Sequence, residues 1–226
     1  MAQQSVDFDG LVSAASERLT LPGRQFIGIA GAPGSGKSTT VERLYDALIT
    51  KQPDAVAILP MDGFHYDDAV LHDMGRRPWK GAPDTFDVGG FVSVLKRLRD
   101  PNETRVAVPV FDRDLEISRG SARIIPDDVK LILVEGNYIL LNRAPWNALE
   151  KSFDLTVMID VPEDELRRRL RARWEHFGLS EDDIAHKLDG NDLPNGRVVA
   201  TESINAHLHL RHDDCEICTD EGDPSG

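Results

Sequence analysis

One stretch near the start of the chain, residues 25–44, constrains the fold more than any other. It consists of an apolar run, QFIGIA, a glycine-rich segment, GAPGSGKS, and a sequence that favours a helix. The spacing of Gly31, Gly36, Lys37 and Ser38 fits the pattern G-x-x-x-x-G-K-[ST], which is meaningful where it connects a strand to a helix. There the backbone N–H groups of the turn and of the helix start converge on one anion. The stretch therefore predicts a loop that binds the phosphates of a nucleoside triphosphate.

Every residue of this loop is a candidate nucleotide ligand: Gly31, Ala32, Pro33, Gly34, Ser35, Gly36, Lys37, Ser38 and Thr39. We expect Lys37 to place its charge near the β- and γ-phosphates and the Ser38 hydroxyl to bind Mg²⁺. ATP and Mg²⁺ are therefore the expected cofactors. The pattern alone leaves open whether the γ-phosphate goes to water, goes to a small molecule, or drives a conformational switch.

Apolar runs recur along the chain, with helical segments between them. Five runs are short and rich in Val, Ile and Leu: residues 25–30, 55–60, 105–110, 130–136 and 155–161. Runs that are apolar on both faces are typical of buried parallel strands. Helices are expected at 7–19, 37–51, 88–100, 145–151, 163–177 and 180–189, and a final strand at 206–210. The alternation predicts an α/β fold with a doubly wound, five-stranded parallel sheet, helices on both faces and a small lid.

The net charge of −13 limits the partners of the chain. Nucleic acids and anionic membranes attract an excess of positive charge, so binding to either is not expected. No apolar run approaches the roughly 20 residues that span a bilayer, and the first residues do not resemble a signal peptide. Two cysteines, Cys215 and Cys218, are too few for a disulfide framework, and with the neighbouring histidines they are only a weak zinc signal. We expect a cytoplasmic protein that acts on a small molecule.

Two acidic residues are expected at the same edge of the sheet as the phosphates. The run 130–136 includes Glu135 near its end, and the run 55–60 leads into MDGFH, which contains Asp62 and His65. Ligands of open α/β sheets bind at the carboxyl ends of the strands, so both carboxylates should approach the nucleotide. We expect Glu135 to help to hold Mg²⁺ and Asp62 to accept the proton of an attacking hydroxyl or to coordinate metal. His65 is a candidate acceptor ligand, with a packing role as the alternative.

The stretch ELRRRLRARWEHFG, residues 165–178, is rich in arginine. On a helix, Arg169 and Arg173 share one face at a spacing of i, i+4. Arginines on a mobile lid neutralise the charge of a phosphoryl group during transfer. We therefore expect Arg169 and Arg173 to act on the phosphates and the other arginines to be solvated.

Taken together, these motifs resemble the P-loop kinase family that contains uridine kinase, bacterial pantothenate kinase and phosphoribulokinase. The similarity runs from about residue 25 to 210 and includes, in order, GAPGSGKST, MDGFH, RRPWKGAPDTFD, PVFDRDLEIS, ILVEGNYILL and FDLTVMIDVPEDELRRRLRARW. The chain is most like the bacterial subgroup named fructose-transport-system kinases or nucleoside-kinase-like proteins. We expect a helical lead-in at 1–24, a P-loop kinase domain at 25–212 and a disordered acidic tail at 213–226.

The resemblance also implies roles for individual residues. It makes Asp62 the aspartate that activates the acceptor, Glu135 the acid of a Walker-B-like strand, and Arg169 and Arg173 the lid arginines. The residues expected to line the acceptor site are His65, Lys80, Asp84, Arg113 and Asn137. Around Arg113 the sequence VFDRDLE lacks the pattern PxYDFxxH of uridine kinase and the tyrosine and histidine expected of pantothenate kinase. A sugar or another small polar alcohol is therefore the expected acceptor, and the name of the bacterial subgroup that the chain resembles implies a fructose-like sugar. A nucleoside or pantothenate is the alternative.

The leading hypothesis is a small-molecule kinase that moves the γ-phosphoryl group of ATP to an alcohol. Asp62 would deprotonate the hydroxyl, while Lys37 and a lid arginine would stabilise the transferring charge. A GTPase-like switch is a second hypothesis, although no asparagine of the chain precedes a lysine, as the guanine motif N-K-x-D requires. A regulatory ATP-binding module is a third. Because relatives often form oligomers, a homodimer is also expected.

Overall fold

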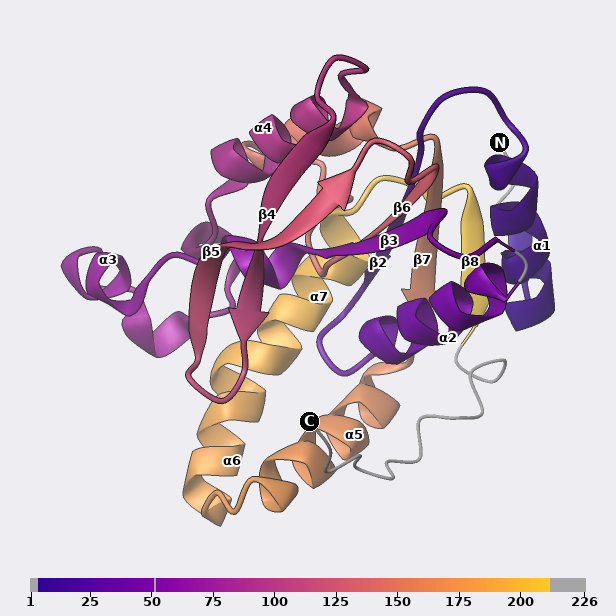
Figure 1. The fold of residues 1–226 in the computed structure, drawn as a ribbon. Coiled ribbons are helices and arrows are strands. Elements are labelled where there is room, and N and C mark those ends of the chain that lie inside the picture. Colours follow the sequence, from indigo (N-terminus) through magenta and orange to yellow (C-terminus); the bar gives the residue numbers. More distant parts are fainter. Residues whose placement is uncertain (1–3, 51, 212–226) are drawn as a thin grey trace.

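The structure, a computed structural model, describes residues 4–50 and 52–211. These residues form a six-stranded parallel sheet with the strand order β1-β8-β7-β2-β6-β3 (Figure 1). Its strands are β1 (Gln4–Val6), β2 (Gln25–Gly31), β3 (Val56–Pro60), β6 (Leu131–Glu135), β7 (Leu155–Asp160) and β8 (Leu208–Arg211). The expected α/β fold is confirmed, with six parallel strands in place of five. The tail expected at 213–226 lies outside the described residues.

Helices cover both faces of the sheet, because successive residues of a strand point to opposite sides. In β2, for example, Phe26 and Ile27 belong to two different hydrophobic clusters. The Ile27 cluster includes residues of α1 (Phe8–Leu19) and α2 (Lys37–Ile49), and the Phe26 cluster includes residues of α4 (Val88–Arg99) and α7 (Leu193–Glu202). The core therefore consists of two layers, and the apolar runs seen in the sequence form the strands between them.

The expectation that residues 105–110 form a strand of the parallel sheet is wrong. Strand β4 (Arg105–Asp112) pairs antiparallel with β5 (Ile117–Pro126) in a separate two-stranded ribbon. In β4 the buried side chains alternate, and only Val106 and Val108 are fully covered. One-sided burial is typical of an antiparallel ribbon that lies on the surface of a domain. Within the parallel sheet, β8 corresponds to the final strand expected at 206–210, and β1, which pairs with it, was not expected.

The N-terminal segment expected as a helical lead-in contains α1, and Asp7 caps this helix by accepting a hydrogen bond from the Gly10 N–H at 2.8 Å. It also contains β1, so the segment contributes an edge strand to the central sheet. The helix expected at 145–151 is a 3₁₀ helix at Trp146–Ser152. In the described part of the chain, no helix combines the length and the apolar composition that a bilayer crossing requires.

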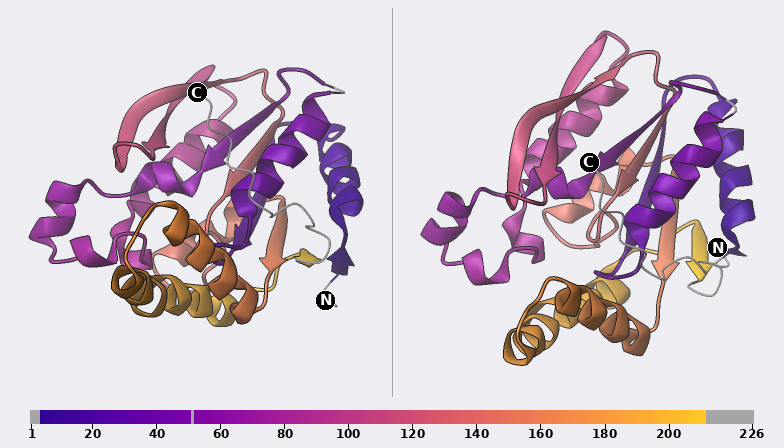
Figure 2. Two further views of the ribbon diagram at one scale, coloured as in Figure 1. Left: turned by 90° about the horizontal axis from the view of Figure 1, so that it is seen from below. Right: turned by 60° about the horizontal axis from the view of Figure 1, so that its bottom comes forward.

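The lid, residues 163–192, lies at the carboxyl edge of the sheet (Figure 2). It consists of α5 (Glu163–His176), α6 (Glu181–Lys187) and a π-helical turn at Leu188–Asp192, after which α7 returns to the sheet. A small apolar core, with Leu166, Leu170 and Ile184 at its centre, also includes Ala32 of the phosphate loop. The sequence predicted α5 and α6, but it did not predict the π turn or α7.

Candidate active site

The phosphate loop, residues 31–39, connects β2 to α2 and takes its shape from glycines. Gly34 and Gly36 have φ values of 77° and 84°, a region that residues with a Cβ seldom adopt. Gly36 also caps α2, and the Thr40 N–H donates to its carbonyl at 2.9 Å. At Gly31 a Cβ would lie 2.6 Å from the Ser35 Oγ, which leaves no space for a side chain. The loop therefore has the compact form in which backbone N–H groups are available to phosphate oxygens.

The buried Glu135 and the half-buried Lys37 lie close together behind this loop. Burial lowers the pKa of Lys37, and the charges of Glu135 and Asp62 oppose that shift. Burial raises the pKa of Glu135 to about 7 against the opposing charge of Lys37. The Ser38 hydroxyl donates a hydrogen bond to the Glu135 carboxylate. Each group thus stabilises the charge of another in a site that excludes most water.

The oxygens of Ser38 and Glu135 are suited to Mg²⁺, which prefers hard oxygen ligands and commonly takes one or two from protein and the rest from phosphates and water. The contact between them places two such oxygens side by side at the exit of the phosphate loop. In the described part of the chain no three His, Cys, Asp or Glu side chains form a metal-binding cluster. A Mg²⁺ ion here would take oxygens from Ser38 and Glu135.

Asp62 lies on the short 3₁₀ helix Met61–Phe64, which follows the end of β3. Its Oδ2 accepts a hydrogen bond from Arg113 at 3.1 Å. Close backbone approaches fix this helix, because a Cβ at Gly63 would lie 2.7 Å from the Pro109 carbonyl oxygen. The charge of Asp62 raises the pKa values of both Lys37 and Glu135, so the carboxylate lies within electrostatic range of the phosphate loop.

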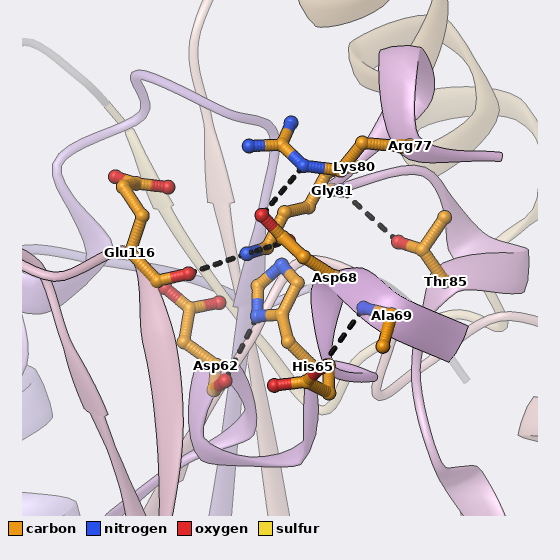
Figure 3. Close-up of polar contacts among 10 residues, drawn as sticks. Asp62, His65, Asp68, Ala69, Arg77, Lys80, Gly81, Thr85 and Glu116 are labelled. Carbon is orange, nitrogen blue, oxygen red and sulfur yellow. Dashed lines mark hydrogen bonds and ion pairs between the residues drawn. The ribbon is translucent and has the colours of Figure 1, made fainter. Parts of the chain in front are cut away.

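The side chain of His65 supports the Asp62 turn from within (Figure 3). Its Nδ1 lies 2.8 Å from the Asp62 carbonyl oxygen, which can only accept, so Nδ1 carries the proton. The imidazole packs against Phe86 and Phe111, with ring centroids at 4.0 and 4.9 Å. Burial lowers the pKa of His65, which keeps the ring neutral. These contacts favour the packing role that the sequence left open.

Residues 77–85 contain Lys80 and Asp84, which were expected from the sequence to line the acceptor site, and we call this segment the acceptor loop. The Lys80 ammonium donates to Asp68 Oδ1 at 2.7 Å and to the Glu116 carbonyl at 2.5 Å (Figure 3). Its side chain is only 8% exposed, so Lys80 ties the loop to α3 (Asp68–Asp73) and to the β4–β5 ribbon. Asp84 forms an ion pair with Arg76 at 2.7 Å and is half exposed. The described contacts of both side chains are thus structural.

The two expected lid arginines both reach the site. Arg169 donates to Glu165 at 2.7 Å and approaches the Ser35 carbonyl of the phosphate loop at 3.4 Å. Burial lowers the pKa of Arg173, and the nearby charge of Arg113 lowers it further. The other arginines of α5 form exposed ion pairs, namely Arg167 with Asp189, Arg168 with Glu165, and Arg171 with Glu175 and Glu181. Arg173 is itself exposed and lies over the Trp174 ring at 5.2 Å. The action of Arg169 and Arg173 on the phosphates stays a prediction.

Several polar contacts around the acceptor loop were not predicted. The Tyr138 hydroxyl donates to the Gly81 carbonyl at 2.6 Å, and the Trp146 Nε1–H donates to the Pro83 carbonyl at 3.0 Å. Asn191, in the π turn, donates to the Lys80 carbonyl at 3.3 Å. Next to Tyr138, the Oδ1 of Asn137 is buried and has no partner among the described residues. The polar run NDLPN, residues 191–195, was a signal that could have drawn attention to the π turn.

Comparison with known proteins agrees with this arrangement. A sequence profile described as the phosphoribulokinase / uridine kinase family matches residues 26–191. The chain belongs to this family. A protein of Schizosaccharomyces pombe, provisionally named a uridine kinase, is 32% identical over 211 residues, or 90% of each chain. Pantothenate kinase of Coxiella burnetii is 35% identical over 117 residues, which is 50% of this chain and 36% of that kinase.

A solved structure from this family resembles the present one over nearly its whole length. It is a protein of Silicibacter sp. TM1040, provisionally named a fructose transport system kinase, with 36% identity and a TM-score of 0.83. The alignment covers 90% of this chain and 98% of that one. Members of the phosphoribulokinase / uridine kinase family are ATP-dependent kinases of small molecules, and the present chain is a small-molecule kinase.

Proposed function

We propose that this kinase transfers the γ-phosphoryl group of ATP to a hydroxyl of a small sugar-like alcohol. The observation that carries the proposal is the position of Asp62 directly after β3, within electrostatic range of the half-buried Lys37 and paired with Arg113. Asp62 Oδ2 is engaged by Arg113, which leaves Oδ1 to accept the hydrogen of an acceptor hydroxyl.

The chemistry is an in-line displacement at the γ-phosphorus. The acceptor oxygen forms a bond to phosphorus, the bond to the β–γ bridging oxygen breaks, and the proton of the hydroxyl passes to Asp62. Lys37, Arg169 and Arg173 neutralise the charge that spreads over the phosphoryl oxygens. Mg²⁺, held by Ser38 and Glu135, would screen the charge of the β- and γ-phosphates. Because Lys37 is half-buried, its charge acts more strongly than it would in water.

A sugar-like acceptor is supported by the groups near Asp62. Arg113 is a charged hydrogen-bond donor, and Asn137 Oδ1, which has no partner within residues 4–50 and 52–211, can accept a hydrogen bond from a hydroxyl. The provisional name of the Silicibacter protein agrees with this class. A nucleoside is the second candidate, because the relative from Schizosaccharomyces pombe is provisionally named a uridine kinase. A panel of hexoses, pentoses, nucleosides and pantothenate in an ATP-consumption assay distinguishes the two.

Asp62→Asn tests the assigned base. With the best acceptor of the panel, we expect kcat to fall by roughly 10²- to 10⁴-fold, the usual contribution of a general base, while the KM for ATP stays within threefold. Asp46→Asn, which neutralises an exposed carboxylate on α2, is the matched control and should behave like the wild type. If Asp62→Asn retains activity within a few-fold of the wild type, Asp62 is not the base.

A further inference from the structure

The π-helical turn at residues 188–192 points two consecutive polar side chains in different directions. π turns inside helical segments often occur at functional sites. Asn191 donates from Nδ2 to the Lys80 carbonyl of the acceptor loop at 3.3 Å. Asp192 accepts from the Trp174 Nε1–H of α5 at 2.8 Å. The turn is therefore bonded to the lid helix through one residue and to the acceptor loop through the next.

On the lid, the π turn lies close to the arginine Arg173. Asp192 is buried, and its charge raises the pKa of Arg173, so the two groups are close. Trp174, which holds Asp192, directly follows Arg173 on α5, and its ring also lies under the Lys187 ammonium at 4.5 Å. A movement of α5 toward the phosphates would therefore carry the π turn with it.

A neighbouring side chain orients the Asn191 amide for its contact with the Lys80 carbonyl. Asn195, one turn further along α7, donates from Nδ2 to Asn191 Oδ1 at 3.0 Å. Asn195 is buried, with 7% of its surface exposed. Because the amide oxygen of Asn191 is occupied in this way, its NH₂ group faces the Lys80 carbonyl.

On the other side, the peptide units at Lys80 and Gly81 are held firmly. The Lys80 side chain is tied to Asp68 and Glu116, and the Gly81 carbonyl accepts from Tyr138 at 2.6 Å. Gly81 has a φ of 97°, a backbone conformation that residues with a Cβ seldom adopt. The Asn191 contact thus acts on a rigid part of the acceptor loop.

We propose that Asn191 is a positioning residue that couples the lid to the acceptor loop, so that engagement of the nucleotide by the lid sets the acceptor loop for the reaction. The inference rests on the proposed function, because it assigns the lid to ATP and the loop to the acceptor. Coupling between two ligand sites is reciprocal, so the acceptor strengthens ATP binding by the same factor as ATP strengthens acceptor binding. The coupling also discourages ATP hydrolysis, because the closed lid and the ordered acceptor loop form together.

Hydrogen exchange with a non-hydrolysable ATP analogue and Mg²⁺ tests the coupling without knowledge of the acceptor. In the wild type, we expect the analogue to slow exchange in peptides of the lid and in peptides that cover residues 77–85. In Asn191→Ala, the lid stays protected, and the protection of the acceptor loop falls by roughly fivefold or more, the lower end of common coupling factors. Asn191→Asp retains the oxygen that pairs with Asn195 but removes the donor, and it should give the same result.

Asp189→Asn is the matched control, since Asp189 lies in the same π turn but pairs with Arg167 inside the lid. In this variant, the analogue should slow hydrogen exchange in residues 77–85 as it does in the wild type. With an acceptor from the panel, Asn191→Ala should raise the acceptor KM about fivefold or more, with kcat changed much less, and abolish the effect of acceptor on the KM for ATP.

The outcomes separate this inference from the proposed function. If the analogue binds and protects the lid of the wild type but leaves residues 77–85 unchanged, the coupling is refuted and the nucleotide site stands. Unchanged protection of the acceptor loop in both Asn191 variants also refutes the role of Asn191. If the analogue protects neither the lid nor the phosphate loop, the nucleotide site itself is wrong and the coupling fails with it.

Discussion

The phosphate loop and the acceptor loop are held in place by different means. The phosphate loop is shaped by its own backbone, with Gly34 and Gly36 in the left-handed region and a hydrogen bond from the Ser35 N–H to the Ala32 carbonyl at 3.1 Å. The acceptor loop contains two short 3₁₀ helices, Arg77–Trp79 and Pro83–Thr85, and accepts hydrogen bonds from side chains far away in the sequence. These side chains are Tyr138, Trp146 and Asn191.

The two loops differ in this way because the nucleotide is the same ligand for every kinase, whereas the acceptor differs from one kinase to another. A triphosphate presents the same oxygens to every kinase, so a loop built from adjacent residues can bind it in any member of a family. An acceptor site must be adjusted to one alcohol, and a loop held from several elements can be altered at each of them. Substitutions in the phosphate loop should therefore act locally on nucleotide binding, whereas substitutions around the acceptor loop should act from a distance.

The largest effect is expected where the phosphate loop meets the lid. An alanine Cβ at Gly34 would lie 2.8 Å from the Leu170 Cγ of α5, and its φ of 77° is unfavourable for any L-residue. We expect Gly34→Ala to lower the free energy of unfolding by about 2–4 kcal/mol, combining backbone strain with overpacking, and to weaken ATP binding at least tenfold. Chemical denaturation and calorimetric titration measure the two effects.

Gly23→Ala is the control for Gly34→Ala, because Gly23 has nearly the same φ, 76°, but no atom within 4 Å of the added Cβ. Its free energy of unfolding should fall only by the cost of backbone strain, about 1–2 kcal/mol, and it should bind ATP normally. Equal losses in the two variants would show that the contact with Leu170 does not constrain the phosphate loop.

The phosphate loop was also the part of the site that the sequence predicted best. The glycines, Lys37 and Ser38 are contiguous, so their spacing alone defines the geometry. Asp62 and Glu135 were placed at the sheet edge because a parallel strand fixes the position of its last residue. Lys80 and Asp84 were expected to line the acceptor site, but their charges are taken up by Asp68 and Arg76, which no local pattern identifies.

In the fold, too, the elements defined by local sequence were predicted and those defined by distant contacts were not. The buried strands could be identified from their apolar runs, and α5 from its helical spacing. The run at 105–110 has the same composition as those strands, yet it pairs in an antiparallel ribbon, because strand pairing depends on contacts across the chain. Asn191 and Asp192 were missed for a related reason: the polar run that contains them draws attention to the segment, but the π turn itself depends on the packing of α6 and α7.

A smaller effect is expected at Tyr138, which holds the acceptor loop through a hydroxyl. Tyr138→Phe leaves the Gly81 carbonyl without this donor, and we expect a loss of about 1–2 kcal/mol in stability. The acceptor KM should rise about five- to tenfold, the equivalent of roughly 1 kcal/mol, while the KM for ATP stays within twofold. Steady-state kinetics with each substrate varied in turn measure this split.

Tyr45→Phe, on α2, is the control for Tyr138→Phe and should leave both KM values unchanged. An equal rise in both KM values in Tyr138→Phe would contradict the distinction between the two loops, because the acceptor loop would then influence nucleotide binding without the lid.

The smallest effect is expected at Asp192, where the π turn of the lid carries a buried carboxyl group. Burial raises the pKa of Asp192, although the Trp174 hydrogen bond and the charges of Lys187 and Arg173 oppose this shift. A carboxyl whose pKa is higher in the folded state than in the unfolded state loses stabilising free energy as the pH rises through that interval.

Asp192→Asn keeps an oxygen for Trp174 but never ionises, so it should be more stable than the wild type at neutral pH by about 1 kcal/mol or less. The difference, measured by chemical denaturation, should shrink as the pH is lowered and the wild-type carboxyl becomes protonated. A variant less stable than the wild type at neutral pH would show that the attraction of Asp192 to Arg173 and Lys187 outweighs its loss of hydration, and that the lid turn is held by charge as firmly as the phosphate loop is held by its backbone.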